Sequence, residues 1–286
     1  MHNSGRALAD ATPAGAGDSN LEQRLEAAMP LTGQGQRDCG NRAKSAAHPA
    51  RVMLCRVDSL TDLSHDTSEL RLAIEDGGRF GFFAGQYAQI EFAPEFCRYY
   101  SMASTPAEEQ LLFHLRRTPG GTAGSYVAQQ LKPGDKVKVS GPLGSSYLRD
   151  EHTGPVLLIA GGSGLAPMLS ILRTLLAREV SRRVVLYFGV RSERDVYHER
   201  LLAGLAEDHD NFSYAIVLSE PDGASSRRRG LVHQAVADDL ADASAYTVYL
   251  AGPTTMVEAA GELLLGRGVA GCDIHGDAFR YPPPGP

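Results

Sequence analysis

The chain has 286 residues, of which 43% are hydrophobic and 22% charged, and its formal net charge is −6. This length predicts two domains, and the composition is typical of a globular protein with buried cores. The acidic balance argues against nucleic-acid binding, which usually needs a basic surface, and the lack of an apolar run of about 18 residues argues against a membrane span.

The first 49 residues are rich in small and polar types and show little periodicity. We therefore expect a disordered or weakly structured tail over 1–49, with no secretory signal. The four cysteines are far apart in the sequence and form no CxxC pair: Cys39, Cys55, Cys97 and Cys272. This spacing predicts free thiols and a cytoplasmic protein.

Residues 50–151 consist of short alternating runs separated by turns such as "TPGG", "KPGD" and "GPLG". This pattern predicts an antiparallel β barrel or sandwich. The run at 85–92 should place one face polar and the other apolar, with Ala88, Ile90 and Phe92 on the apolar face. One helix is expected over 124–131, with Ser125 as its N-cap.

At Pro155 the pattern changes to a strict alternation of strands and helices. Strands are expected at 155–160, 183–190, 212–220, 245–252 and 272–279, and helices from about Met168 to Leu176 and at 195–207, 231–240 and 255–268. Such an alternation predicts a doubly wound parallel α/β sheet, here over 152–280. A proline-rich tail follows at 281–286.

The first strand of this sheet leads into the glycine-rich turn "AGGSGLAP". Gly161, Gly162 and Gly164 allow the backbone to approach a phosphate, and Pro167 fits the first helical turn. Free N–H groups and the helix dipole favour an anion there. A tight strand–helix connection would also favour glycine, but this position in a parallel sheet favours a nucleotide.

Two further stretches are expected beside that turn. "YLAGPTTM" carries Gly252, Pro253 and Met256 at another strand–helix turn on the same sheet edge. "RYYSMAS" supplies Arg98 near the end of a barrel strand, and "HLRRTPGGTAGS" supplies Arg116 and several glycines. Taken alone, "RYYS" is equally typical of a strand end with surface aromatics. Together these groups could hold a pyrophosphate.

The ordered set "RYYS", "GPLGSSYLRD", "AGGSGLAP", "YLAGP" and "DAF" resembles the ferredoxin–NAD(P)H reductase family over residues 51–279. It is most similar to the reductase components of bacterial aromatic-ring dioxygenases of the benzoate and anthranilate type. The resemblance implies a six-stranded FAD-binding barrel followed by an NAD-binding α/β domain. Electrons would pass from NADH through FAD, singly, to an iron–sulfur ferredoxin or oxygenase partner.

The resemblance also implies roles for individual residues. Arg98 would pair with the flavin diphosphate, Tyr100 would pack on the isoalloxazine, Ser101 would bond near the hydride-accepting nitrogen, and Phe279 would cover the flavin. The other expected FAD contacts are Tyr99, His114, Leu115, Arg116, Thr122, Gly124 and Ser125. The expected NADH contacts are Gly161, Gly162, Ser163, Gly164, Glu220, Gly252, Pro253 and Met256.

Two features depart from the family pattern. The cysteines cannot form the C-x4-C-x2-C cluster that many relatives carry in a ferredoxin domain, so we expect no iron–sulfur cluster in this chain and a separate acceptor protein. Ala251 stands where many relatives have cysteine. Glu220 would repel a 2′-phosphate, which predicts NADH over NADPH, although one of the arginines in "SSRRRG" could offset that charge. We expect that run to be a solvated loop.

The histidines show no metal-ligand spacing, and His65, His198, His209 and His233 are expected at the surface. The sequence leaves two alternatives to the main function. One is a flavin or deoxysugar-type reductase of the same fold. The other is a non-catalytic electron-transfer subunit of a larger complex.

Overall fold

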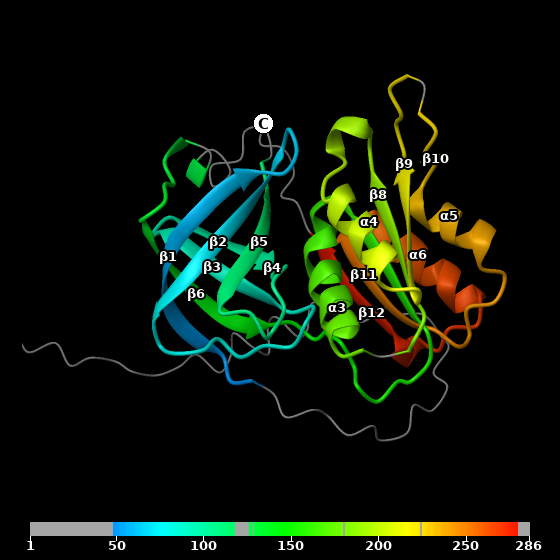
Figure 1. The fold of residues 1–286 in the computed structure, drawn as a ribbon, viewed down its shortest axis with the longest axis horizontal. Coiled ribbons are helices and arrows are strands. Elements are labelled where there is room, and N and C mark those ends of the chain that lie inside the picture. The colour runs from blue at the N-terminus through cyan, green and yellow to red at the C-terminus, as the bar shows by residue number, and fades with distance from the viewer. Residues whose placement is uncertain (1–47, 118–125, 128, 180, 224, 280–286) are drawn as a thin grey trace, which may run out of the picture. The chain divides into compact units, whose positions relative to one another are not determined.

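The computed structural model describes residues 48–117, 126–127, 129–179, 181–223 and 225–279. They form two six-stranded sheets, one antiparallel and one parallel (Figure 1). All of them belong to one compact unit, Gln36–Pro286. The tails expected at 1–49 and 281–286 lie almost wholly outside the described residues, as do Thr122, Gly124 and Ser125. The domain limits drawn from the sequence therefore stay predictions.

The antiparallel sheet has the strand order β4-β3-β6-β1-β2-β5. Its edge strands meet where Met102 bridges Phe113, so the sheet curls into a barrel, as predicted. The strands are β1 (Arg51–Asp62), β2 (Thr67–Asp76), β3 (Tyr87–Ala93), β4 (Phe96–Ser101), β5 (Gln110–Arg116) and β6 (Lys136–Leu143).

Side-chain alternation explains why this sheet closes around a core. In β3 the buried positions are Ala88, Ile90 and Phe92, and the residues between them are half-exposed, which confirms the predicted faces. In β5 the inward residues Phe113 and Leu115 join the barrel core. The outward residues of β5 are therefore left to face another part of the protein.

The parallel sheet has the order β10-β9-β8-β7-β11-β12 and confirms the doubly wound α/β prediction. Its strands are β7 (Val156–Gly161), β8 (Val184–Val190), β9 (Phe212–Leu218), β10 (Arg228–Arg229), β11 (Thr247–Pro253) and β12 (Ile274–Phe279). The helices are α3 (Leu165–Ala177), α4 (Glu199–Asp208), α5 (Val232–Asp239) and α6 (Thr254–Gly266). Every residue of β7 is buried, as expected for a strand covered on both faces.

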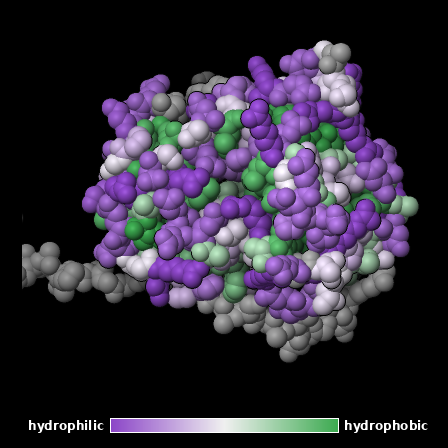
Figure 2. Space-filling view, in the orientation of Figure 1, coloured by the Kyte–Doolittle hydropathy of each residue, from purple (hydrophilic) through white to green (hydrophobic). Residues whose placement is uncertain are grey.

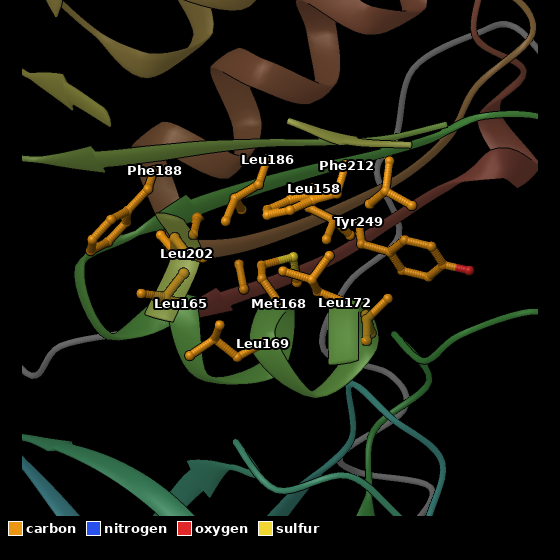
Figure 3. Close-up of a cluster of buried hydrophobic side chains, with 14 of the residues drawn as sticks. Leu158, Leu165, Met168, Leu169, Leu172, Leu186, Phe188, Leu202, Phe212 and Tyr249 are labelled. Atoms are coloured by element: carbon orange, nitrogen blue, oxygen red, sulfur yellow. The ribbon is translucent and has the colours of Figure 1, made fainter. Parts of the chain in front are cut away.

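A separate hydrophobic cluster covers each face of the parallel sheet. Figure 3 shows part of one, in which Met168, Leu169 and Leu172 of α3 lie against Leu158 and Leu186 of the sheet. Burying a side chain of this size stabilises the fold by roughly 1.5–3 kcal/mol. The apolar residues that recur at helical spacing in this segment of the sequence thus form the core-facing side of α3.

The barrel packs on α3 through apolar and polar contacts, and Ala84 and Leu148 join the core cluster that contains the buried residues of α3. Ala103, Leu112 and Ala166 form a separate apolar contact. The Ser170 hydroxyl donates to the carbonyl of Ser104 at 2.6 Å. Arg173 donates to both carboxylate oxygens of Glu108, at 3.0 and 3.1 Å. A bidentate pair fixes direction as well as distance, so these contacts set how β5 and α3 meet.

Two elements differ from the sequence prediction at their starts. The helix expected from 195 begins at Glu199, because Asp195 closes a capping box with Ser192 in a short 3-10 turn, Glu193–Asp195. The last strand begins at Ile274 rather than at Cys272, which lies in the 3-10 turn Gly271–Asp273.

The cysteines also differ from the prediction. Cys55 is a buried free thiol and Cys97 a half-exposed one. Cys272 is disulfide-bonded, so the expectation of free thiols throughout is wrong for this residue. Separation along the sequence does not report distance in space, which decides whether a disulfide can form.

No helix in the described part of the chain has the length and apolar character needed to cross a membrane. The face shown in Figure 2 is largely hydrophilic, and its apolar residues appear as separate spots rather than one continuous patch. Single exposed apolar residues of this kind are normal for a protein surface.

The packing of Gly164 predicts a strong effect of one added methyl group. A Cβ at Gly164 would overlap the carbonyl oxygen of Ala251, whereas a Cβ at Gly204, inside α4, would meet nothing within 4 Å. Gly164→Ala should destabilise the protein by about 1–3 kcal/mol through overpacking. Gly204→Ala should stabilise it by about 0.5–1 kcal/mol, because glycine weakens a helix interior.

Urea unfolding followed by circular dichroism compares the two variants with the parent. A Gly164→Ala variant as stable as the parent would show that the two turns have room to separate.

Candidate functional site

The first glycine turn connects β7 to α3 through the 3-10 turn Gly162–Gly164. Gly162 has φ +55°, a left-handed conformation that glycine adopts without strain, and a Cβ there would meet only the Arg116 side chain, at 3.6 Å. The start of α3 has no side-chain cap and no acidic residue in its first turn. The helix dipole therefore favours an anion there, and no side chain of the helix competes for the site. The N–H of Leu165 itself donates to the carbonyls of Gly162 and Ser163.

The second glycine turn, after β11, lies directly against the first. A Cβ on Gly161 would come within 2.6 Å of the Met256 sulfur and 2.9 Å of the Pro253 ring. A Cβ on Gly252 would come within 3.0 Å of the Gly161 backbone. Because β7 and β11 are neighbouring parallel strands, both turns lie at the carboxyl edge of the sheet. The structure therefore brings together the two turns that the sequence placed on one edge.

Strand β4 carries the "RYYS" residues, and they divide between two sides. Tyr100 packs against the barrel core, with its ring 6.1 Å from that of Phe92. Tyr99 is 48% exposed, and its ring lies edge-on to Tyr87 at 5.8 Å. Burial raises the pKa of Tyr100 to about 12, so its hydroxyl stays protonated at pH 7. Arg98 is exposed, and its guanidinium donates to the neighbouring Cys97 carbonyl at 2.7 Å.

Ser101 joins the barrel to the carboxyl edge of the parallel sheet. Its hydroxyl donates to Asp277 at 3.1 Å. Asp277 lies on β12, opposite Ala251 of β11, and so beside the second glycine turn. Desolvation by burial raises the pKa of Asp277 to about 6, and the hydrogen bond from Ser101 offsets part of that effect. A carboxyl group that exchanges its proton near neutral pH thus faces the expected hydride-accepting position.

Sequence analysis missed Asp277 as a site residue. The only signal was its place two residues before Phe279 in the last strand. Phe279 itself is half-buried against the core of the α/β sheet, and its carbonyl accepts a hydrogen bond from Thr254 at 3.2 Å. Its expected place over a flavin stays a prediction.

Strand β5 places its three expected cofactor residues on different sides. Leu115 points into the barrel core. Arg116 points outward, and its Nε donates to Asp66 at 3.0 Å. His114 is buried against the α/β domain, with Nδ1 3.4 Å from the hydroxyl of Tyr197 and Nε2 3.2 Å from Nε2 of His198. Their contacts with FAD stay predictions.

Burial lowers the pKa of His114 well below its usual range, and the neighbouring His198 lowers it further. His198 is half-buried, so the expectation that it lies on the surface is wrong. The segment before α4 carries many charged residues, but its charges alone do not show that all its side chains face solvent. The left-handed backbone at His198 turns this side chain toward β5.

Two arginines of the run 227–229 are held by ion pairs, and the third is exposed, so the run is not the solvated loop expected from the sequence. Arg227 binds both oxygens of Glu199 at 2.8 Å and also Glu193 at 2.9 Å. Arg228 binds Asp238 and Asp239, and Arg228–Arg229 form the short strand β10 beside β9. Glu220, just beyond β9, is exposed. The expected loop is therefore a structured edge, because Arg227 and Arg228 have acidic partners and Arg229 donates to the carbonyl of Gly223 at 3.2 Å.

Comparison with known proteins places these two sheets in described families. Residues 54–147 match the model of the oxidoreductase FAD-binding domain, and residues 158–262 match that of the oxidoreductase NAD-binding domain.

Two curated proteins are similar to this chain over most of its length. One is the ferredoxin–NAD(P)(+) reductase component of the naphthalene 1,2-dioxygenase/salicylate 5-hydroxylase systems of a Ralstonia species, which is 41% identical over 82% of this chain and 71% of the relative. The corresponding naphthalene 1,2-dioxygenase component of Pseudomonas putida is 37% identical over 93% of this chain and 81% of the relative.

Solved structures agree with this similarity. The crystal structure of an Amycolatopsis cytochrome P450 reductase has a TM-score of 0.77 at 35% identity and covers 82% of this chain and 71% of that one. The ferredoxin reductase of a carbazole 1,9a-dioxygenase has a TM-score of 0.75 at 31% identity, with the same coverage.

The raised pKa of Asp277 predicts a pH-dependent stability in the flavin-free protein. An unfolded aspartate has a pKa of about 3.9, so the folded protein binds the proton more tightly and loses stability as pH rises from about 4 to about 6. Asp277→Asn keeps an acceptor for Ser101 without the charge. It should be more stable than the parent at about pH 7.5, by on the order of 1–3 kcal/mol, and similar at about pH 4.

Thermal unfolding at both pH values measures this difference. The exposed Asp222, changed to asparagine, is the matched control and should show no such pH-dependent gain. An equal gain from Asp277→Asn at both pH values would contradict the argument.

Proposed function

Because this chain belongs to the ferredoxin–NAD(P)(+) reductase family, we propose that it oxidises NADH at a bound FAD and passes the electrons to an iron–sulfur ferredoxin or oxygenase component. One observation carries this proposal. Ser101, at the end of the "RYYS" strand, bonds to Asp277 at the edge where both glycine turns lie. That contact brings the expected flavin-contacting strand to the dinucleotide edge of the other sheet.

The residues present fit both cofactors. The guanidinium of Arg98 is exposed and donates a hydrogen bond to a backbone carbonyl rather than to a carboxylate. Its charge is therefore available for a diphosphate. The first glycine turn offers an open backbone at Gly162 and an uncapped helix start. These two groups of donors would hold FAD through the barrel and NADH through the α/β sheet.

A bound flavin supplies the conversion between hydride transfer and single-electron transfer. The chain's own residues would position the reactants and manage one proton. Ser101 donates its one hydroxyl hydrogen to Asp277 in the flavin-free protein, and Asp277 would hold or release a proton near neutral pH. When Asp277 is protonated, it would donate to the Ser101 oxygen, and the Ser101 hydrogen would then be free to point toward the flavin ring. Phe279 would shield the ring from water, and the contacts of Ser170 and Arg173 with the barrel would keep the distance between the sites constant.

The acceptor would be a separate protein. The relatives named above are components of multi-protein oxygenase systems, which supports such a partner. Burial raises the pKa of Cys55 to about 12, which is unsuited to a metal-ligating thiolate. Together with the cysteine spacing, this supports our proposal that the chain carries no iron–sulfur cluster of its own.

Flavin loading and reduction test the proposed function. The protein purified with FAD should keep a flavin absorption spectrum after desalting, and NADH should bleach it in the absence of air. Arg98→Ala should weaken FAD binding by about 10- to 100-fold, because a charge-assisted hydrogen bond contributes roughly 1.5–3 kcal/mol.

Arg51→Ala, an exposed change on β1, is the matched control and should bind FAD like the parent. The proposal would be refuted if the desalted parent protein were colourless and failed to oxidise NADH with every artificial acceptor tried. If Arg51→Ala lost as much FAD as Arg98→Ala, the role of Arg98 would be refuted, but the proposed function would not.

We also propose that NADH is preferred over NADPH. Glu220 adds a negative charge just beyond the end of β9. Two of the three arginines that could offset it, Arg227 and Arg228, are paired with Glu193, Glu199, Asp238 and Asp239, and the exposed Arg229 donates to the carbonyl of Gly223. A carboxylate near a 2′-phosphate repels it by about 1 kcal/mol in water and by about 4 kcal/mol in a partly shielded site. This supports a preference of roughly fivefold to several hundredfold.

The ratio of kcat/KM for NADH to that for NADPH tests the preference. The parent ratio should be well above one, and Glu220→Gln should lower it by about fivefold to tenfold by removing the repulsion. Glu207→Gln, an exposed change on α4, should leave it unchanged. A parent that uses NADPH as well as NADH would contradict the assignment.

A further inference from the structure

Three metal-ligating side chains converge where the barrel meets the segment before α4. They are Glu69 of β2, His114 of β5 and His198, and one ligand atom of each lies within 4.8 Å of the other two. Nε2 of His114 is 3.2 Å from Nε2 of His198, and Nε2 of His198 is 3.8 Å from a Glu69 carboxylate oxygen. Neither the family comparison nor the proposed function uses this cluster as a site.

The cluster is built from strand register. Glu69 and His114 are direct partners in the β2–β5 pairing, so their side chains share the outer face of the barrel. Arg71 donates to Oε1 of Glu69 at 3.1 Å, which leaves Oε2 toward His198. A neighbouring donor that holds one carboxylate oxygen and so directs the other is a usual outer-shell feature of metal sites.

The hydroxyl of Tyr197 sets the tautomer of His114. That hydroxyl donates to the carbonyl of Gly162 at 3.0 Å, so toward His114 it acts as an acceptor, and Nδ1 of His114 carries the hydrogen. The lone pair of His114 Nε2 then points at His198. Two nitrogens at this distance cannot both carry hydrogens. Ligating histidines usually donate their second N–H to an oxygen in this way.

His198 is held in an unusual backbone conformation. Its φ is +57°, in the left-handed region that residues other than glycine seldom adopt. Such backbone strain concentrates at functional positions. Here it occurs at the residue that turns its ring toward β5 and completes the cluster.

We propose that Glu69, His114 and His198 bind one divalent ion of the zinc class, with solvent as the fourth ligand. Two nitrogens at 2.0–2.1 Å from a tetrahedral ion lie roughly 3.3–3.4 Å apart, close to the observed 3.2 Å. Imidazole and carboxylate are the donors that zinc accepts. Glu69 and His198 keep 16% and 17% of their side-chain surface exposed, so an ion can enter.

The bound ion would join the two domains. Two ligands come from the barrel and one from the α/β domain, and the Tyr197 hydroxyl links the site to Gly162 of the first glycine turn. Arg173 lies nearby, and its positive charge is compensated by the ion pair with Glu108.

A second group of possible ligands, His65, Asp66 and Asp195, is the natural comparison. Its carboxylates already have partners. Asp66 accepts from Arg116 and Thr67, and Asp195 accepts from Ser192 in the capping box. Binding an ion there would break these interactions, so His65 serves as the control position.

Zinc and cobalt binding test the site on the flavin-loaded protein, with affinity tags removed and metals stripped by a chelator. Competition with a chromophoric chelator should show one equivalent of Zn²⁺, and Co²⁺ should give the absorption bands of tetrahedral coordination at longer wavelengths than the flavin. His198→Asn suits the left-handed backbone, since asparagine tolerates it. It should weaken binding at least about 100-fold, because even outer-shell changes cost about 10- to 100-fold.

Glu69→Gln should also weaken Zn²⁺ binding, Tyr197→Phe should weaken it by about 10- to 100-fold, and His65→Gln should not change it. Thermal unfolding should shift upward with Zn²⁺ in the parent and not in His198→Asn. The proposal fails if the parent binds Zn²⁺ no more tightly than His198→Asn, or if His65→Gln abolishes binding. Flavin loading and NADH oxidation of the metal-free parent report separately on the proposed reductase function.

Discussion

The contact between the two glycine turns, at the ends of β7 and β11, is the constraint on which the ligand edge of the α/β sheet depends. Gly164 lies against the Ala251 carbonyl, and Gly252 lies against the backbone of Gly161. Backbone meets backbone there, with no room for a side chain. The start of α3 is thereby pressed onto the sheet edge with no side-chain cap and no acidic residue in its first turn, which is an arrangement that suits an anionic dinucleotide.

The barrel completes this edge through a joint with apolar and polar contacts. Ala103, Leu112 and Ala166 pack together, and Ala84 and Leu148 join the core cluster of α3. The polar contacts include Ser104 with Ser170, Glu108 with Arg173, and Ser101 with Asp277. Directional bonds fix orientation more sharply than apolar contact does. A reductase of this family has to bring a flavin and a nicotinamide into register, and this joint suits that requirement.

Part of the positive charge beside β9 is neutralised. The arginines at 227 and 228 are paired with acidic residues, whereas Arg229 and Glu220 are left exposed. On the other side of the joint, His114 and His198 meet beside Glu69 in a geometry that a zinc ion fits. The pairing of β2 with β5 within the antiparallel sheet places Glu69 beside His114 and so creates this cluster.

The sequence by itself determined the two sheets, their order along the chain and the two glycine turns. Periodicity and glycine placement act over a few residues, so they can be read without the fold. Only the tertiary structure decided the partners of Ser101 and His114, since Asp277 and His198 are 176 and 84 residues away. It also decided where α4 begins, because a capping box at Ser192 and a left-handed His198 outweigh the helical pattern of "DVYHER". Interactions between distant segments depend on how strands pair and domains pack, and no local pattern encodes them.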